Sequence, residues 1–371
     1  MHKKKVYVIT LQNVRNYGSA LQAVATQKVF EELGCDVKFF DYYKSLEDIG
    51  FVKRAMGYAE GNGLAGRIVK TMMLIPTFAK QDKVFRTFLK QNLNVIPGRV
   101  ATEDDFSRLT LDADIYCTGS DQTWNSGWNN GILRPLFLTF APAGKRRIAY
   151  AASFGKPQLD EWEVEETKRL LSRYAVISVR EASAATIVHD LHIGIEAVHV
   201  LDPTLQVDGV FWRKMSHPVK YEKYCFLYQL NRNNDFDRFA LEMAHRRGLK
   251  LLRWCNRYDQ LRLSGDIKVA VPDVEDFVSL IDHADFVLTD SFHCTAFSCN
   301  LHKQFLSVYP SEYSSRLASL LKLTNLEHRH VERFEAENYD DIPSIDFSSV
   351  DAILKQEREK GRDFLTKALE N

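Results

Sequence analysis

Four side chains that could bind an anion or move a proton stand together near residue 290 of this sequence. Asp290, Ser291, His293 and Thr295 follow the apolar run of residues 286–288. Such a run is typical of a buried strand, and the residues after it have helical composition. The free N–H groups at a helix start favour an anion, and an imidazole titrates near neutral pH. We therefore interpret this segment as a strand-to-helix turn that carries His293 as a candidate proton donor.

Asp290 and His293 each allow a second interpretation. Asp290 could orient His293, or it could cap the following helix, because a carboxylate accepts hydrogen bonds from free helix amides. His293 could polarise a bound anion instead of transferring a proton, and a lone histidine is often structural. The sequence leaves these alternatives open.

Other predicted strands of the chain also end in polar turns. Arg180 ends one of them and can make a two-pronged contact with a carboxylate or phosphate, although an ion pair with Glu181 or another carboxylate would also explain it. We expect a second wall of the site, opposite Arg180 and His293 and suited to the hydroxyl groups of a sugar. Its predicted residues are Asn16, Ser19, Gln22, Ser120, Asp121, Gln122 and Trp124. For Trp124, burial in the core is the alternative. Because the carboxyl ends of parallel strands share one edge of a sheet, we expect these turns to converge.

The elements that position these turns alternate between strand and helix. Strands are predicted at residues 6–11, 37–41, 113–116, 147–151, 175–179, 198–201, 224–230, 249–254, 286–288 and 304–309. The pattern breaks near residue 215, and such alternation on both sides of a break favours two doubly wound Rossmann-like α/β domains with a cleft between them. We assign residues 1–215 and 216–345 to these domains and 346–371 to a C-terminal helix.

Residues 50–80 interrupt this alternation. They are rich in glycine, and their charges are mostly cationic, while residues 64–78 are apolar with interspersed cations. This composition suits a lid helix or a helix on a membrane surface; an ordinary surface excursion packed on the domain is the preferred interpretation. A helix is predicted next, at residues 83–93.

The overall composition excludes several classes of protein. Lys and Arg together number 49, as do Asp and Glu, so a nucleic-acid partner is not expected. The six cysteines form no CxxC pair and are typical of a reduced intracellular protein. The start, Met1 to Lys5, leads into a strand rather than a signal peptide, and no apolar run reaches the roughly 18 residues of a membrane span. We expect a cytoplasmic location, with peripheral contact at the inner face of the membrane as an option.

Metal and nucleotide patterns are missing from the sequence. No histidine pair has a third ligand nearby, and no H-x-E, P-loop or GxGxxG pattern occurs. We therefore predict no metal and no cofactor.

The polar turns together resemble the polysaccharide pyruvyl transferase family. The matching pieces are residues 16–22, 118–125, 148–155, 177–181, 201–204 and 289–297, with Arg316 as a later match. The resemblance implies an arrangement like that of GT-B glycosyltransferases and a phosphoenolpyruvate donor. The implied reaction transfers a carboxyvinyl unit to a sugar diol, which gives a pyruvate ketal and free phosphate.

The resemblance also assigns roles to individual residues of both domains. It implies catalysis by His293 with Asp290, and a donor site formed by Arg180, Ser291, Thr295 and Arg316. Ser291 stands where some members have an arginine, and Cys294 stands where glycine is frequent.

Three functional hypotheses follow. The first is a pyruvyl transferase of bacterial surface polysaccharide synthesis, such as capsule or exopolysaccharide, with phosphoenolpyruvate as co-substrate and a lipid-linked saccharide as acceptor. The second is a nucleotide-sugar-dependent glycosyltransferase on the same fold. The third is a saccharide-binding member of the family without catalysis. The sequence names neither the sugar nor the oligomeric state.

Overall fold

The computed structural model describes residues 3–45, 50–61, 63–311 and 314–370. The predictions for Met1 and His2, for the last residue of the C-terminal helix and for residue 62 of the 50–80 segment lie outside the described residues. No described helix is long and apolar enough to cross a membrane.

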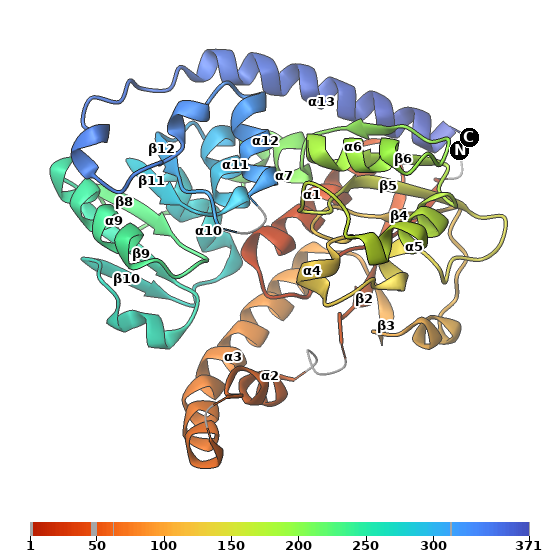
Figure 1. Ribbon diagram of the computed structural model, residues 1–371, viewed down its shortest axis with the longest axis horizontal. Coiled ribbons are helices and arrows are strands. Elements are labelled where there is room, and N and C mark those ends of the chain that lie inside the picture. Colours follow the sequence, from red (N-terminus) through yellow and green to blue (C-terminus); the bar gives the residue numbers. More distant parts are fainter. Residues whose placement is uncertain (1–2, 46–49, 62, 312–313, 371) are drawn as a thin grey trace.

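The first half of the chain forms a parallel seven-stranded sheet (Figure 1). Its order is β3-β2-β1-β4-β5-β6-β7. The strands are β1 (Lys5–Ile9), β2 (Asp36–Tyr42), β3 (Val95–Val100), β4 (Ile115–Thr118), β5 (Arg146–Ala152), β6 (Val176–Val179) and β7 (Ala197–His199). The order reverses direction next to β1, where α/β sheets form ligand crevices.

The second half forms a parallel five-stranded sheet in the order β10-β9-β8-β11-β12. Its strands are β8 (Tyr224–Tyr228), β9 (Lys250–Cys255), β10 (Ile267–Ala270), β11 (Phe286–Thr289) and β12 (Phe305–Ser307). The prediction of two doubly wound α/β units is confirmed. The proposed domain boundary near residue 215 falls between β7 and β8.

Two strands were missed in the sequence. In β3, only the second and last residues are buried, and Pro97 and Gly98 interrupt its apolar pattern. All residues of β10 are half-buried, and the strand includes Lys268. Both are edge strands, which bury too little apolar surface to show the period of a core strand.

Helices cover both sheets (Figure 1). They are α1 (Tyr17–Glu32), α2 (Phe51–Tyr58), α3 (Leu64–Asn92), α4 (Ser126–Asn129), α5 (Glu161–Leu171), α6 (Ala182–Asp190), α7 (Pro203–Gln206), α8 (Gly209–Arg213), α9 (Asn234–Arg246), α10 (Val274–Asp282), α11 (Phe292–Asn300), α12 (Ser315–Leu323) and α13 (Phe347–Glu370). Short 3₁₀ turns occur at Glu103–Arg108, Arg134–Phe137, Tyr258–Arg262, Glu327–Arg329 and Ala336–Tyr339.

One hydrophobic cluster contains side chains from both sheets. Tyr17 of α1 stacks on Phe277 of α10, contacts Trp254 edge-on and donates a hydrogen bond to the carbonyl of Pro272 at 3.0 Å. Helix α13 returns to the first half, where the carbonyl of Ala368 accepts a hydrogen bond from Arg146 at 3.0 Å. These contacts fix the polar turns of the two halves against each other.

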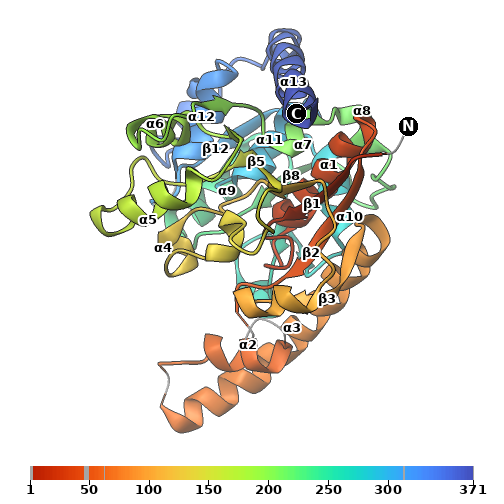
Figure 2. The ribbon, with the colours of Figure 1, turned by 90° about the vertical axis from the view of Figure 1, so that its right-hand side faces the viewer.

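The 50–80 segment differs from the preferred interpretation. Helices α2 and α3 form a hairpin whose outer end projects away from the body, as Figures 1 and 2 both show. The helix predicted at 83–93 is the inner end of α3, which runs through Pro76 for 29 residues. The described part of the segment is therefore a projecting arm and not an excursion packed on the first domain.

Candidate functional site

Polar turns from both halves meet around Arg180. Arg180 follows β6, and its guanidinium group lies 2.6 Å from a carboxylate oxygen of Asp202, which follows β7. It lies 3.1 Å from Asp121, which follows β4. The side chains of Arg180 and Asp202 are fully buried. Arg180 therefore forms ion pairs with these two aspartates and not with Glu181, while its contact with a donor stays a prediction.

These charges hold one another ionised. Burial alone would raise the pKa of Asp121, but the charge of Arg180 and further favourable contacts lower it to about 2. The pKa of Asp202 is lowered for the same reason, against the effect of its burial. Burial would lower the pKa of Arg180, yet the two carboxylates raise it. Asp121 also has a φ of 81°, an uncommon conformation for a residue other than glycine, which is frequent at functional sites.

His293 lies in the first turn of α11 beside this ion-pair network. Its Nε2 atom is 3.9 Å from Asp202 and has no hydrogen-bond partner among the described residues, although it is buried. Burial, reinforced by the charge of Arg180, lowers the pKa of His293 to about 4 against the opposing effect of Asp202. The imidazole is therefore neutral near pH 7 and has a ring nitrogen free for a ligand.

The start of α1 packs directly on His293. A β-carbon added to Gly18 would lie 2.1 Å from Nδ1 and 2.6 Å from Cβ of His293. Only a glycine allows this approach, which brings the N-terminal end of a helix from the first half to the imidazole of the second. The positive end of that helix favours a negative charge nearby.

A second arginine faces the same aromatic ring as Arg180. The guanidinium carbon of Arg180 lies 5.1 Å from the centre of the Phe292 ring, and that of Arg316 lies 5.7 Å from it. Arg316 is half-buried and forms no ion pair with a described residue. Burial and the charge of Arg180 lower the pKa of Arg316 to about 10, so it stays cationic at neutral pH.

Several buried polar atoms in these turns lack hydrogen-bond partners among the described residues. They are Nε of Arg180, Nε of Arg316, Nε2 of His293 and one carboxylate oxygen of Glu181. The other oxygen of Glu181 accepts three hydrogen bonds, from Ser153, Phe154 and Gly155. Buried polar atoms are normally paired, and atoms that are not paired within the protein are available to a ligand.

The remaining residues of the predicted donor site make other contacts. Asp290 accepts hydrogen bonds from the backbone of Leu230 and Asn231, both at 2.7 Å. Asp290 therefore holds the loop after β8. Burial raises the pKa of its carboxyl group. These contacts match neither of the predicted roles of Asp290, which were to orient His293 or to cap the helix. Ser291 caps α11 instead, through the N–H of Cys294. Thr295 is buried, and its hydroxyl hydrogen-bonds to Ser307 at 2.7 Å.

Most of the predicted acceptor wall does converge. Ser19 donates a hydrogen bond to Asp121, and Ser120 donates one to Asp202 at 3.1 Å. Asn16 caps α1. Gln22 is buried, donates to Thr10 at 3.1 Å and keeps its side-chain oxygen without a partner among the described residues.

Gln122 and Trp124 face elsewhere. The side-chain oxygen of Gln122 accepts a hydrogen bond from Asn125 at 2.6 Å. Trp124 is 2% exposed, stacks on Phe137 and donates to the carbonyl of Leu136 at 3.2 Å. Its ring is part of the hydrophobic core and has no face free for a sugar. Trp124 therefore does not belong to the acceptor wall that the sequence predicted.

A known family profile covers most of the chain, including the polar turns described above. The sequence profile described as polysaccharide pyruvyl transferase matches residues 16–312. The chain belongs to this family. A search of curated proteins found no match.

Several solved structures share the fold of this chain. Arabidopsis thaliana UGT89C1, complexed with UDP-L-rhamnose or with quercetin, is similar with TM-scores of 0.54 and 0.50, at 9% identity and with 99% of each chain covered. UDP-GlcNAc 2-epimerase from Neisseria meningitidis, bound to UDP-GlcNAc, has a TM-score of 0.48 at 10% identity, with 99% of each chain covered. At such low identity the likeness to UGT89C1 shows the fold alone, and it agrees with the predicted GT-B arrangement.

Three residues of this candidate site were not singled out as site residues in the sequence. Asp202 was recognised only as part of a polar strand end, and its position after β7 was the available signal. The sequence placed Phe292 in a helix and Gly18 in a flexible turn, with no role in the site for either. Their contacts join segments far apart in the chain, which a single sequence does not reveal. Among the described residues, no group of three His, Cys, Asp or Glu side chains is arranged to hold a metal ion.

Proposed function

We propose that this member of the family transfers the carboxyvinyl group of phosphoenolpyruvate to a saccharide diol and forms a pyruvate ketal. The observation that carries the proposal is the pair of arginines on Phe292 beside an imidazole nitrogen without a partner. Phosphoenolpyruvate presents a carboxylate and a phosphate, which guanidinium groups bind well. Arg316 is the cation proposed to contact the donor. Arg180 offers only its Nε atom, because its other two nitrogens contact aspartates.

His293 is proposed to supply the proton. Its pKa of about 4 in the free protein makes it neutral, and a bound phosphate dianion would stabilise the imidazolium form and raise that pKa. The proton goes to the methylene carbon of the donor as a sugar hydroxyl attacks C2. Phosphate then leaves and takes up the proton of the attacking hydroxyl, and the second hydroxyl closes the ketal and returns its proton to His293. The acceptor is proposed to lie against Asn16, Ser19, Gln22, Ser120 and Asp121.

Thermal unfolding with millimolar phosphoenolpyruvate tests the donor. A ligand at 100 times its dissociation constant adds roughly 2.7 kcal/mol to the free energy of unfolding, so we expect a clear rise in the wild-type midpoint. Arg316→Gln should remove that rise, whereas Lys322→Gln, at an exposed position on the same helix, should keep it. Stabilisation by a panel of nucleotide sugars, with no response to phosphoenolpyruvate, would instead support the glycosyltransferase. Full cellular function in His293→Ala would support a binding protein.

The α2–α3 arm supports a further part of the proposal, namely an acceptor carried on a lipid at the inner face of the membrane for surface polysaccharide synthesis. Large apolar side chains are exposed along the arm at Phe51, Val52, Met56, Tyr58, Leu64, Ile68, Val69, Met72 and Met73. Lys53, Arg67 and Lys70 lie among them. Apolar side chains interspersed with cations suit the surface of an anionic bilayer.

Flotation with vesicles containing phosphatidylglycerol tests the membrane contact. We expect the wild type to float with the vesicles and Ile68→Glu/Met72→Glu to bind at least tenfold more weakly, since burying each apolar side chain contributes about 1.5–3 kcal/mol. The matched control is Trp162→Glu/Val210→Glu, which changes exposed apolar side chains elsewhere. Equal loss in both variants, or no flotation of the wild type, contradicts the membrane contact.

A further inference from the structure

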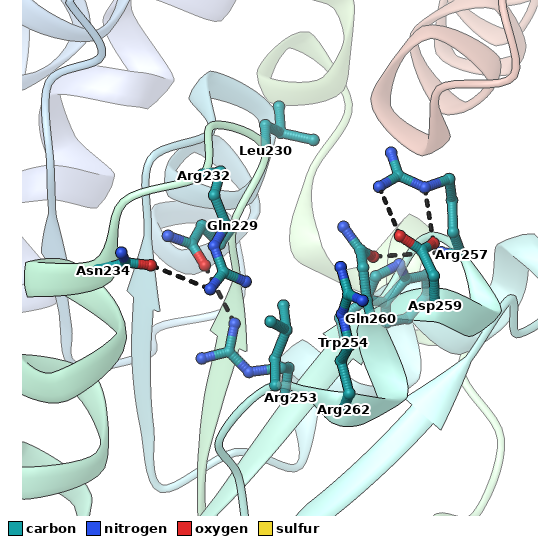
Figure 3. Close-up of a pocket in the computed structure, with 11 residues that line it drawn as sticks. Gln229, Leu230, Arg232, Asn234, Arg253, Trp254, Arg257, Asp259, Gln260 and Arg262 are labelled. Atoms are coloured by element: carbon teal, nitrogen blue, oxygen red, sulfur yellow. Dashed lines mark hydrogen bonds and ion pairs between the residues drawn. The ribbon is translucent and has the colours of Figure 1, made fainter. Parts of the chain in front are cut away.

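A pocket outside the His293 turn is lined with arginines. It has a volume of about 480 Å³ and is formed by the loops that follow β8 and β9. Figure 3 shows Arg232 and Arg253 on one side of it and Arg257 and Arg262 on the other. Loops at the carboxyl ends of parallel strands are where open α/β sheets bind ligands, and the volume lies in the range of small-molecule sites.

The pocket carries an excess of positive charge. Arg257 forms a two-pronged ion pair with Asp259 at 2.8 and 3.0 Å. Arg232 and Arg253 share Asp237, at 3.5 and 2.9 Å. Arg262 forms no ion pair with a described residue. Two aspartates thus face four arginines, and the net charge of about two matches a phosphate ester or a diphosphate.

The pocket walls are held in place before any ligand binds. Arg253 is 2% exposed and donates hydrogen bonds to Gln229 at 3.0 Å and to the carbonyl of Ser264. A buried guanidinium with these partners fixes the loops after both strands. Preformed walls lower the entropy cost of binding a ligand.

Contacts connect the pocket to both the His293 turn and the arm. Asp290, three residues before His293, binds the backbone of Leu230 and Asn231, in the loop after β8. On the other side, Gln81 of α3 donates to the carbonyl of Asn256 at 2.8 Å, and Thr77 accepts from the N–H of Tyr258 at 3.2 Å. The pocket therefore lies between the proposed reaction site and the base of the arm.

We propose that this arginine pocket binds the phosphate or diphosphate that links the acceptor saccharide to its carrier. The inference rests on the proposed transferase function and names the part of the acceptor that the protein recognises. The phosphate group is held at the edge of β8 and β9, and the saccharide extends toward His293. The same phosphate chemistry occurs in a lipid carrier and in a nucleotide carrier.

Calorimetric titration of the full chain with inorganic pyrophosphate tests the pocket. The variant is Arg232→Gln/Arg262→Gln, because both arginines are exposed and their replacement leaves the core intact. The control is Arg108→Gln/Arg238→Gln, at side chains that are 77% and 81% exposed elsewhere, which changes the net charge equally. We expect at least tenfold weaker pyrophosphate binding in the pocket variant and unchanged binding in the control. Equal binding in the two variants overturns the proposal.

Further titrations separate this inference from the proposed function. Phosphoenolpyruvate should stabilise the pocket variant as well as the wild type; displacement of pyrophosphate by phosphoenolpyruvate at a single shared site overturns the proposal of a separate pocket. Farnesyl diphosphate and UDP distinguish the carriers. Tighter binding of farnesyl diphosphate than of pyrophosphate, lost in the pocket variant, supports a lipid carrier. The corresponding result with UDP supports a nucleotide carrier.

Discussion

Replacing Gly18 by alanine is expected to lower turnover by at least 100-fold while both sheets stay folded. The new methyl group would lie 2.1 Å from Nδ1 and 2.6 Å from Cβ of His293, closer than carbon atoms come to either. The contact with Cβ remains whichever way the ring turns, so α1 must move relative to α11, and the buried imidazole moves with it. Overpacking of this kind costs about 1–3 kcal/mol, and a displacement of about 1 Å at a reacting group costs roughly 100-fold in rate. Turnover of phosphoenolpyruvate and the unfolding midpoint are the measurements.

Gly57→Ala is the matched control for this substitution. Gly57 is also a helical glycine, and nothing lies within 4 Å of a β-carbon built on it, so turnover should not change and stability should rise slightly because alanine favours the helix. In a His293→Gly background the Gly18→Ala change should cost much less stability, since the clash is with the side chain of His293, its Cβ included. Wild-type turnover in Gly18→Ala would show that His293 tolerates displacement and would remove its proposed catalytic role.

The contact between Gly18 and His293 illustrates which parts of the site the sequence could predict. Polar residues at strand ends can be recognised one by one, because each follows a short apolar run. For this reason Arg180, Asp121 and His293 were found. Their partners could not be found in the same way: Asp202 approaches Arg180 across two strands of one sheet, and Gly18 approaches His293 across two domains.

Asp290 and Trp124 show that the sequence could not predict the direction of a side chain. A polar turn beside a candidate histidine suggested that Asp290 serves His293, yet its carboxylate holds the loop of a neighbouring strand. Trp124 stands in a polar turn, yet its ring packs on Phe137. Sequence reasoning places a residue on an element, but which direction its side chain takes depends on packing by other elements.

The fold was predictable where burial is deep. The core strands were found because short, mostly apolar runs precede a turn. The edge strands β3 and β10 lack such runs, and α3 passes through Pro76, which a sequence reading treats as a break. The preferred interpretation also did not predict that residues 50–80 project from the body. Their apolar residues resemble those of a packed helix, and their exposure is visible only in three dimensions.

Removing Arg180 is expected to lower the free energy of unfolding by about 3–5 kcal/mol, the usual cost of leaving a buried charge without its partner. In Arg180→Ala, Asp202 would be a fully buried carboxylate without a cation, and Asp121 would lose its main counter-charge. Urea unfolding at pH 7 measures the change. Arg169→Ala is the control, because Arg169 is exposed and pairs with a half-buried Glu166, and ion pairs near the surface contribute about 0–1 kcal/mol.

The pH dependence separates a charge effect from a simple loss of packing. In the wild type the pKa of Asp121 is about 2, below its ordinary value, so this carboxylate stabilises the fold above that ordinary value and ceases to do so as pH falls toward 2. In Arg180→Ala, burial without the arginine raises the pKa of the aspartates above the unfolded value, so protonation favours the folded state at low pH. The stability gap between the two proteins should therefore narrow as pH falls from 7 toward 4. A stability gap that stays constant would mean that Arg180 acts through packing alone.

The triple variant Arg180→Met/Asp121→Asn/Asp202→Asn gives a second test. If the buried charges are responsible, this variant should recover most of the stability that Arg180→Ala loses. If Arg180 acts through packing alone, it should recover little.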